Sequence, residues 1–272
     1  MRDPWDAAIA RAEQLASAEP AAAELLTFTA ALLRAQRDVY AALHWARVAH
    51  GSTRAAGALT GNFQTDLPRM RPLLLPLCQA IATHGPDELA QGAAVLQAAH
   101  PVTLDDMLIE YWQTPSDDQF FAKAFLQPYA RALADAKLTP GDRARIQPDN
   151  RCPFCGGVPQ LAVLRANDVQ ADGGRRHLLC STCLTVWPFR RIFCPNCGEE
   201  DEHKLGYFHA SGTTFAHVRV EACATCQHYL KAVDLSMAGL AIPIVDEIAA
   251  SALDVWAREQ GLTKIERNLV GL

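Results

Sequence analysis

Residues 178–198 read LLCSTCLTVWPFRRIFCPNCG and contain two CxxC pairs. Two more pairs flank this stretch, so eight of the nine cysteines are paired: Cys152/Cys155, Cys180/Cys183, Cys194/Cys197 and Cys223/Cys226. Acidic residues interrupt the first 16 residues where a signal peptide needs an apolar run, which predicts a cytoplasmic protein. Because thiols stay reduced in the cytoplasm, this clustering indicates metal binding rather than a disulfide framework.

The four pairs form an internal repeat. The first pairs of the two units lie 42 residues apart, and the second pairs lie 43 residues apart. Each unit reads CPxCG, then a hairpin-like stretch, then a second CxxC and a hydrophobic strand. Such duplication indicates two copies of one module.

Two CxxC turns at the ends of a hairpin can close a tetrahedral four-thiolate site. Gly156 and Gly198 follow the first turn of each unit, where a positive φ is often required. The repeat therefore predicts two metal ions, the first held by Cys152, Cys155, Cys180 and Cys183 and the second by Cys194, Cys197, Cys223 and Cys226.

Several other chemistries fit this pattern less well. A thioredoxin-like CxxC belongs at the start of a helix in a βαβ unit, not in a hairpin. A catalytic zinc keeps one position open, whereas four thiolates close each site. The sequence contains no HExxH, GxSxG, phosphate-cradling loop or dinucleotide fingerprint, so we predict that the protein is not an enzyme. Thiolates accept both iron and zinc, which leaves the metal open.

The part before the cysteines is rich in Ala and Leu and has helical periodicity. It predicts helices over 4–18, 20–49, 67–83, 86–99, 104–113 (with Thr103 as N-cap) and 117–137. Strand-like runs at 158–165, 175–180, 204–210 and 214–221 flank turn signals at 172–174 and 211–212. A last helix is expected from Pro243 to about Gly261.

These patterns predict an α+β protein. It should have an N-terminal α-helical bundle, two tandem rubredoxin-like (zinc-ribbon-type) four-cysteine modules and a C-terminal helix. The expected divisions are a helical domain at 1–140, a linker at 141–151, modules at 152–193 and 194–235, and a helical tail at 236–272.

Composition limits the partners of this chain. The 272 residues are 50% hydrophobic, which is enough for a core, yet no apolar run approaches the roughly 20 residues of a membrane span. The net charge of −5 disfavours nonspecific binding to nucleic acid. The oligomeric state stays open, a homo-oligomer included.

Some other residues invite a functional interpretation. A partner-binding surface is a hypothesis for two arginine doublets and a tryptophan in the cysteine region, with a solvated edge as the plainer alternative: Arg175, Arg176, Trp187, Arg190 and Arg191. Cys78 lies on an apolar helix and is expected to be a buried small hydrophobe. Asp246 and Glu247 are expected to be exposed helix residues rather than an acid/base pair.

The cysteine region resembles a known family. The segments CPFCGGVPQLAVL (152–164), LLCSTCLTVWPFRRIFCPNCG (178–198), VRVEACATCQHYLKAVDL (218–235) and the stretch 243–272 are similar to the FdhE family of formate dehydrogenase accessory proteins. The likeness extends more loosely into 25–43 and 120–134.

This resemblance implies a maturation factor, a chaperone-like protein needed for active respiratory formate dehydrogenase. It implies a cytoplasmic protein that binds the catalytic subunit of that enzyme, with all eight paired cysteines as metal ligands. It favours iron over zinc as the metal of both sites. Two alternatives stay open: a nucleic-acid-binding zinc ribbon and a rubredoxin-like electron carrier.

Overall fold

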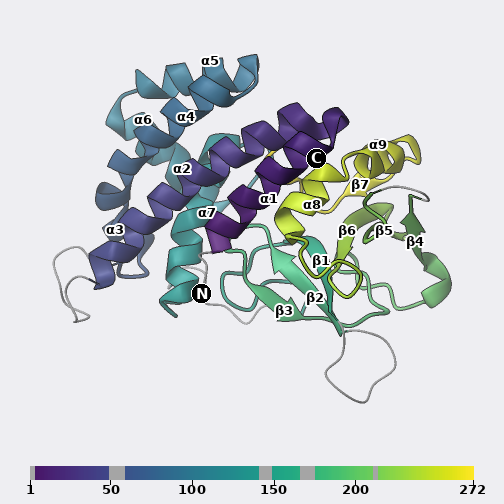
Figure 1. Cartoon of the computed structure of the whole chain (residues 1–272). Helices are drawn as coiled ribbons and strands as arrows, with labels where there is room; N and C mark the ends of the chain where they lie inside the picture. The colour runs from purple at the N-terminus through teal and green to yellow at the C-terminus, as the bar shows by residue number, and fades with distance from the viewer. Residues whose placement is uncertain (1–3, 49–58, 141–148, 166–174, 211–213) are drawn as a thin grey trace.

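The computed structural model describes residues 4–48, 59–140, 149–165, 175–210 and 214–272. Helices from the first half of the chain lie on one side, and a β-sheet with two short helices lies on the other (Figure 1). The predicted α+β fold class is confirmed. The turns expected at 172–174 and 211–212, and most of the expected linker, fall outside the described residues.

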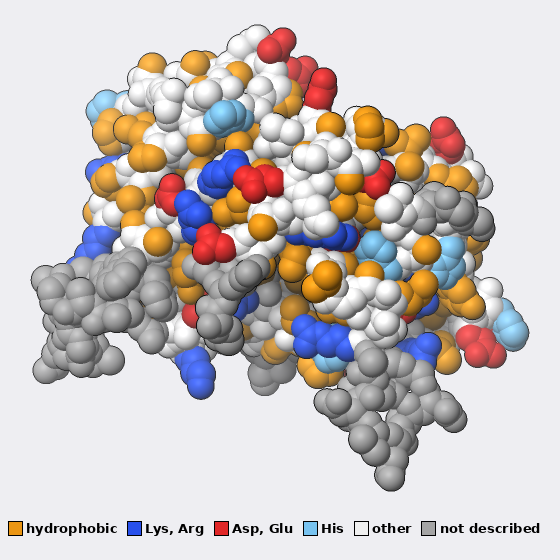
Figure 2. All heavy atoms as spheres, in the orientation of Figure 1, with side chains coloured by type: hydrophobic (Ala, Val, Ile, Leu, Met, Phe, Trp, Pro, Cys, Tyr) orange, Lys and Arg blue, Asp and Glu red, His pale blue; other side chains and the backbone are white. Residues whose placement is uncertain are grey.

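The helical part contains seven α-helices within the described residues. They are α1 (Pro4–Ala18), α2 (Ala23–Val48), α3 (Phe63–Met70), α4 (Leu74–His84), α5 (Asp87–Gln97), α6 (Pro101–Gln113) and α7 (Phe120–Asp135). The apolar faces of α2 to α7 meet around Phe125, Tyr129 and Trp112, which are almost fully buried, whereas α1 packs in a second cluster with α2 and the C-terminal segment. None of the helices described is both long enough and apolar enough to cross a bilayer. Charged side chains lie among the hydrophobic ones on the face of the molecule shown in Figure 2.

Helix boundaries differ from the expected ones where proline intervenes. The helix expected over 67–83 is α3 and α4 joined by a short 3-10 turn (Arg71–Leu73) that contains Pro72. The N-cap expected at Thr103 is wrong, because α6 begins at Pro101, whose φ suits the first helical position. His100 caps that helix, with Nδ1 accepting from Val102 N at 3.3 Å.

The described residues of the second half of the chain form one seven-stranded sheet. Its strands are β1 (Pro159–Arg165), β2 (Arg175–Cys180), β3 (Val186–Pro188), β4 (Leu205–His209), β5 (Val218–Cys223), β6 (His228–Asp234) and β7 (Thr263–Lys264). The order is β3-β2-β1-β6-β5-β4, and β7 pairs with β6. Each cysteine unit therefore contributes three antiparallel strands, as the repeat predicts.

The two units share this one sheet. Strand β1 of the first unit pairs in parallel with β6 of the second, in the register Leu161↔Lys231 to Leu164↔Asp234. The seam is dry, because Leu161, Val163 and Val233 have no exposed surface. Hydrogen bonds and packing thus run through both units.

The C-terminal segment belongs to the same body. The single helix expected over 243–261 is two helices, α8 (Pro243–Ala249) and α9 (Ala252–Glu259), and Gly261 ends the second with φ +76°. Val245 of α8 packs with the cluster between α1 and α2, whereas Ala257 of α9 packs on the sheet. The predicted tail therefore joins the helical part to the cysteine region (Figure 1).

Candidate metal centres

The eight paired cysteines lie in two groups of four. Within each group the Sγ atoms are all within 4.8 Å of one another. The first group is Cys152, Cys155, Cys180 and Cys183, and the second is Cys194, Cys197, Cys223 and Cys226. This grouping, with no crossing between the units, is the one that the repeat predicts.

The sulfur spacing fits a tetrahedral metal. Four thiolates at about 2.3 Å from a zinc ion have sulfur–sulfur distances of roughly 3.8 Å. In the first group Cys152 and Cys183 are 3.6 Å apart, and Cys155 and Cys180 are 3.5 Å apart. In the second group the corresponding distances are 3.8 and 3.7 Å. Each group can therefore hold one ion with small adjustments.

All four CxxC turns share one backbone geometry. In each, the N–H of the residue four positions after the first cysteine donates to that cysteine's carbonyl, at 2.9 to 3.2 Å. That residue has a positive φ: Gly156 at 72°, Gly198 at 81°, Leu184 at 56° and Gln227 at 58°. The expected positive φ of both glycines is confirmed, whereas Leu184 and Gln227 hold the same conformation without being glycine.

Neighbouring groups also support thiolate charge. Thr182 N donates to Cys180 Sγ at 3.3 Å, and Asn196 N donates to Cys194 Sγ at 3.4 Å. Cys183 Sγ in turn lies 3.1 Å from Thr185 Oγ1, to which its thiol donates when protonated. The two N–H bonds favour the ionised form that a metal ligand needs.

The two groups differ in their access to solvent. Every cysteine of the first group is at most 1% exposed. In the second group Cys197 is exposed and Cys226 is partly exposed, whereas Cys194 and Cys223 are buried. The first site is enclosed by the protein, and the second opens to the surface.

The residues suggested for partner binding are not all at the surface. Trp187 is 6% exposed, and its Nε1 donates to Asp149 O at 3.3 Å inside the main core. Arg176 is 5% exposed and pairs with Glu221 at 2.8 Å. Packing holds Trp187 in the core, and the ion pair with Glu221 holds Arg176 in place. Arg190 and Arg191 are exposed, and of Arg175 only the backbone position in β2 is described.

Cys78 is fully buried on α4, as expected, and burial raises the pKa of its thiol to about 11. It lies in the helical core, away from either four-cysteine group. Its thiol stays protonated near neutral pH and has no place in the metal sites.

The structure contains a buried ionic network that the sequence did not predict. Asp246 and Glu247, expected to be exposed, have no exposed surface. Asp246 accepts from Arg11 Nη2 at 2.6 Å and from His217 Nε2 at 2.9 Å, which ties α1 to the sheet. Glu247 accepts from Gln160 Nε2 at 2.8 Å and pairs with Lys264.

The same network continues along the sheet. Lys231, fully buried on β6, pairs with Asp254 of α9 and donates to the carbonyl of Glu247. Burial lowers the pKa of Lys231 to about 8. Charges of both signs are therefore neutralised inside the joint between the sheet and the C-terminal helices.

Comparison with known proteins gives relatives for the cysteine region. Residues 151–191 match the family model "FdhE, central domain", and residues 192–270 match "FdhE, C-terminal domain". A protein FdhE homolog of Aquifex aeolicus is 33% identical over 199 residues, which are 72% of this chain and 68% of that protein. A homolog of Haemophilus ducreyi is 30% identical over 161 residues, 59% of this chain and 50% of that protein.

A solved structure of the same family name has the same fold. The crystal structure of the FdhE protein from Pseudomonas aeruginosa superposes with a TM-score of 0.70 at 22% identity. The superposition covers 99% of this chain and 96% of that one, the helical part included.

Proposed function

The chain belongs to the FdhE family, and on this basis we propose that it is an accessory protein for the maturation of respiratory formate dehydrogenase. In this role it binds the catalytic subunit of that enzyme in the cytoplasm and turns over no substrate of its own. The connection to formate dehydrogenase comes from the name of the family.

The main support for this function is that both cysteine groups are closed. Both cysteine groups are complete sets of four thiolates with the spacing of a closed tetrahedral site. A closed site leaves no coordination position for a substrate, unlike the open site of a metal hydrolase. This arrangement suits a protein that binds and assists another protein.

We take the eight cysteines as ligands of two metal ions, with iron favoured and zinc as the alternative. Bound iron would supply a one-electron couple, whereas bound zinc would supply only a rigid cross-link. The chain itself contributes the enclosed first site, the open second site and the N–H groups that hold both sets of thiolates in place.

The exposure of Cys197 favours a more specific role, in which iron bound at the second site would exchange electrons with the partner protein. Metal analysis of the protein purified anaerobically from its own host tests it. We expect red protein with thiolate-to-iron absorption that dithionite bleaches. Colourless protein with two zinc ions would reject this electron-transfer role and leave the accessory role untouched.

A gene deletion tests the function itself. We expect a deletion strain to lose formate oxidation while the catalytic polypeptide stays detectable on immunoblots. The wild-type gene and a Cys78→Ala variant should restore activity, whereas a Cys180→Ala/Cys183→Ala variant should not. Normal formate oxidation in the deletion strain, with no second copy of the gene in the genome, would overturn the assignment.

A further inference from the structure

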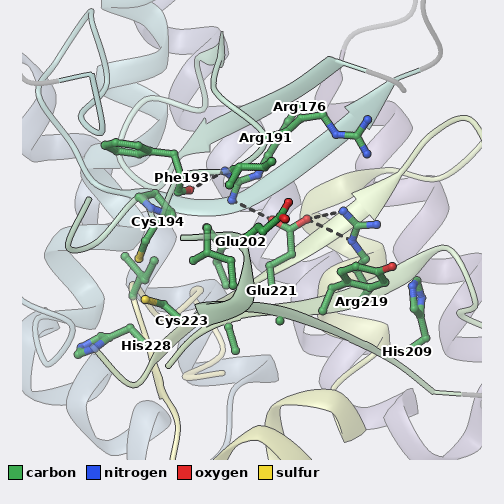
Figure 3. Close-up of a pocket in the computed structure, with 18 of the residues that line it drawn as sticks. Arg176, Arg191, Phe193, Cys194, Glu202, His209, Arg219, Glu221, Cys223 and His228 are labelled. Atoms are coloured by element: carbon green, nitrogen blue, oxygen red, sulfur yellow. Dashed lines mark hydrogen bonds and ion pairs between the residues drawn. The ribbon is translucent and has the colours of Figure 1, made fainter. Parts of the chain in front are cut away.

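A cavity of about 690 Å³ lies beside the second cysteine group. Its floor is formed by β4, β5 and β6, where Tyr207 pairs with Glu221 and Glu221 with Leu230 across the sheet (Figure 3). Two cysteines of the second group, Cys194 and Cys223, also line it. The volume is within the range of about 300–1,000 Å³ that is typical of ligand sites.

The cavity occupies the sheet face opposite the C-terminal helices. Phe208, the neighbour of Tyr207 on β4, points the other way and packs on Trp256 of α9, with ring centroids 4.9 Å apart. Tyr207 instead stands beside His209 and Arg219, with ring centroids 5.8 Å apart and the guanidinium 5.1 Å from the ring. One face of this half-sheet is therefore packed and the other is open.

Strand β4 lies at the end of the sheet. It pairs only with β5, and among the described residues no strand pairs with its outer edge. An edge strand presents a row of N–H and C=O groups that can pair with another chain. Proteins that recognise extended peptides use such an edge for affinity and the neighbouring pockets for specificity.

Large apolar side chains are exposed around the cavity. Tyr207 is 65% exposed, Met237 is 61% exposed and Ile192 is 51% exposed. Exposed apolar side chains that gather at one site mark a binding surface more often than scattered ones do.

The charges of the cavity leave one guanidinium without a partner. Glu221 accepts from Arg219 at 2.6 Å and pairs with Arg176 at 2.8 Å, as the dashed lines in Figure 3 show. Arg191 also lines the cavity and makes no ion pair with any described residue. Of the remaining carboxylates, Asp234 accepts from Ser236, and Glu202, on the short 3-10 turn before β4, also lines the cavity (Figure 3).

We propose that this cavity binds an extended segment of the formate dehydrogenase catalytic subunit, which adds a strand to β4 and places an acidic side chain beside Arg191. The identity of the occupant rests on the proposed function. The unpaired strand edge supplies the backbone partners, the exposed apolar residues supply side-chain contacts, and Arg191 supplies the complementary charge. A segment bound there lies directly against two ligands of the second metal site.

Hydrogen–deuterium exchange on the full-length, metal-loaded protein tests the location. We expect amides of Leu205–His209 and of Arg191–Phe193 to exchange more slowly when the intact catalytic subunit is added. Amides of α5, on the far side of the helical part, should not change.

Two pairs of variants test the chemistry. Tyr207→Ala and Arg191→Glu should each weaken binding of the catalytic subunit about tenfold or more, as central interface residues do. Val95→Ala is the control for the first, because Val95 is 69% exposed on α5. Lys137→Glu is the control for the second, because it makes the same charge change at an exposed position of the helical part. Metal content and circular dichroism confirm that each variant is folded.

Three results would overturn the inference. If the subunit binds while β4 exchange and the affinity of both variants stay unchanged, the cavity is not the site, and the proposed function stands. If the wild-type protein binds no catalytic subunit, the proposed function and this occupant both fail. If the protein alone is a dimer that Tyr207→Ala dissociates, the edge of β4 is covered by a second copy.

Discussion

Replacing Gly157 by alanine tests how tightly the first cysteine group is packed. Gly157 follows the first CxxC turn, and its carbonyl accepts from Cys152 N at 2.9 Å. A Cβ built on Gly157 would lie 2.8 Å from Cys180 Sγ and 2.7 Å from Thr182 Oγ1. The added methyl group therefore meets a proposed metal ligand directly.

The size of the effect follows from these distances. Ordinary contacts of a Cβ atom begin near 3.4 Å, so the sulfur would have to retreat by roughly 0.6 Å. Metal–sulfur distances tolerate only about 0.2 Å, and Cys180 is fully buried with its N–H bonded to Thr185 O. We expect loss of the first metal, together with about 1–3 kcal/mol of stability from overpacking.

Metal content per chain and urea unfolding measure these two effects. Gly198→Ala is a glycine-to-alanine control at the second group, at the position equivalent to Gly156, where the nearest atom to the new Cβ is Phe193 Cζ at 3.5 Å. It has no contact with a ligand sulfur and carries only the cost of a positive φ, about 1–2 kcal/mol. It should therefore keep both metals. A Gly157→Ala protein with two metals and wild-type stability would refute the reasoning.

Three further predictions concern charge and ligation. Cys155→Ser should lose one metal of two by elemental analysis while Cys78→Ser keeps both, and equal loss from the two variants would contradict the grouping. Burial raises the pKa of Glu221, but the guanidiniums of Arg176 and Arg219 lower it by more, so the pKa lies below its ordinary value of 4.5. The ion pairs of Glu221 therefore stabilise the folded state above pH 4.5. This stabilisation is lost as the pH falls through the lower pKa of the folded state. The stability of Glu221→Gln, followed by acid titration in urea, should accordingly fall less steeply below pH 4.5, and identical slopes would count against this pairing. Asp254→Asn leaves the buried Lys231 ammonium without its carboxylate and should cost about 3–5 kcal/mol, whereas a loss under 1 kcal/mol in urea would show that the pair contributes little.

Regular local patterns in the sequence predicted much of this structure. The 42- and 43-residue spacings give the correct grouping of the cysteines, because a repeat fixes which turns share a hairpin. The positive φ of Gly156 and Gly198 follows from the turn geometry that any such pair needs. Helix α1 spans the predicted 4–18, since its periodicity and its proline act within one segment.

Long-range partners account for what the sequence did not predict. Asp246 and Glu247 look like exposed helix residues because Arg11 lies 235 positions away and Gln160 lies 87 positions away. Contacts between residues so far apart leave no local pattern in the sequence, so these two buried carboxylates cannot be told from exposed ones by sequence alone. The parallel pairing of β1 with β6 is equally invisible, since both strands are buried on all sides and lack alternation.

The burial of Trp187 and Arg176 has the same origin. A tryptophan and an arginine doublet in a short segment are typical of binding surfaces. Here Trp187 fills the core under Asp149, and Arg176 meets Glu221 of the second unit. Arg191, by contrast, is exposed and makes no ion pair with any described residue.

The seam between β1 and β6 has a consequence for how the chain is made. Arg165 ends β1, and His228 begins β6 63 residues later. A ribosome adds about 5–20 residues per second, so one edge of β1 stays unpaired for about 3–13 seconds before β6 is synthesised. The first cysteine group is already complete at Cys183 during that interval. Metal can therefore enter the first site before β6 and the last two cysteines have been synthesised, so the order of translation allows the first site to fill before the second.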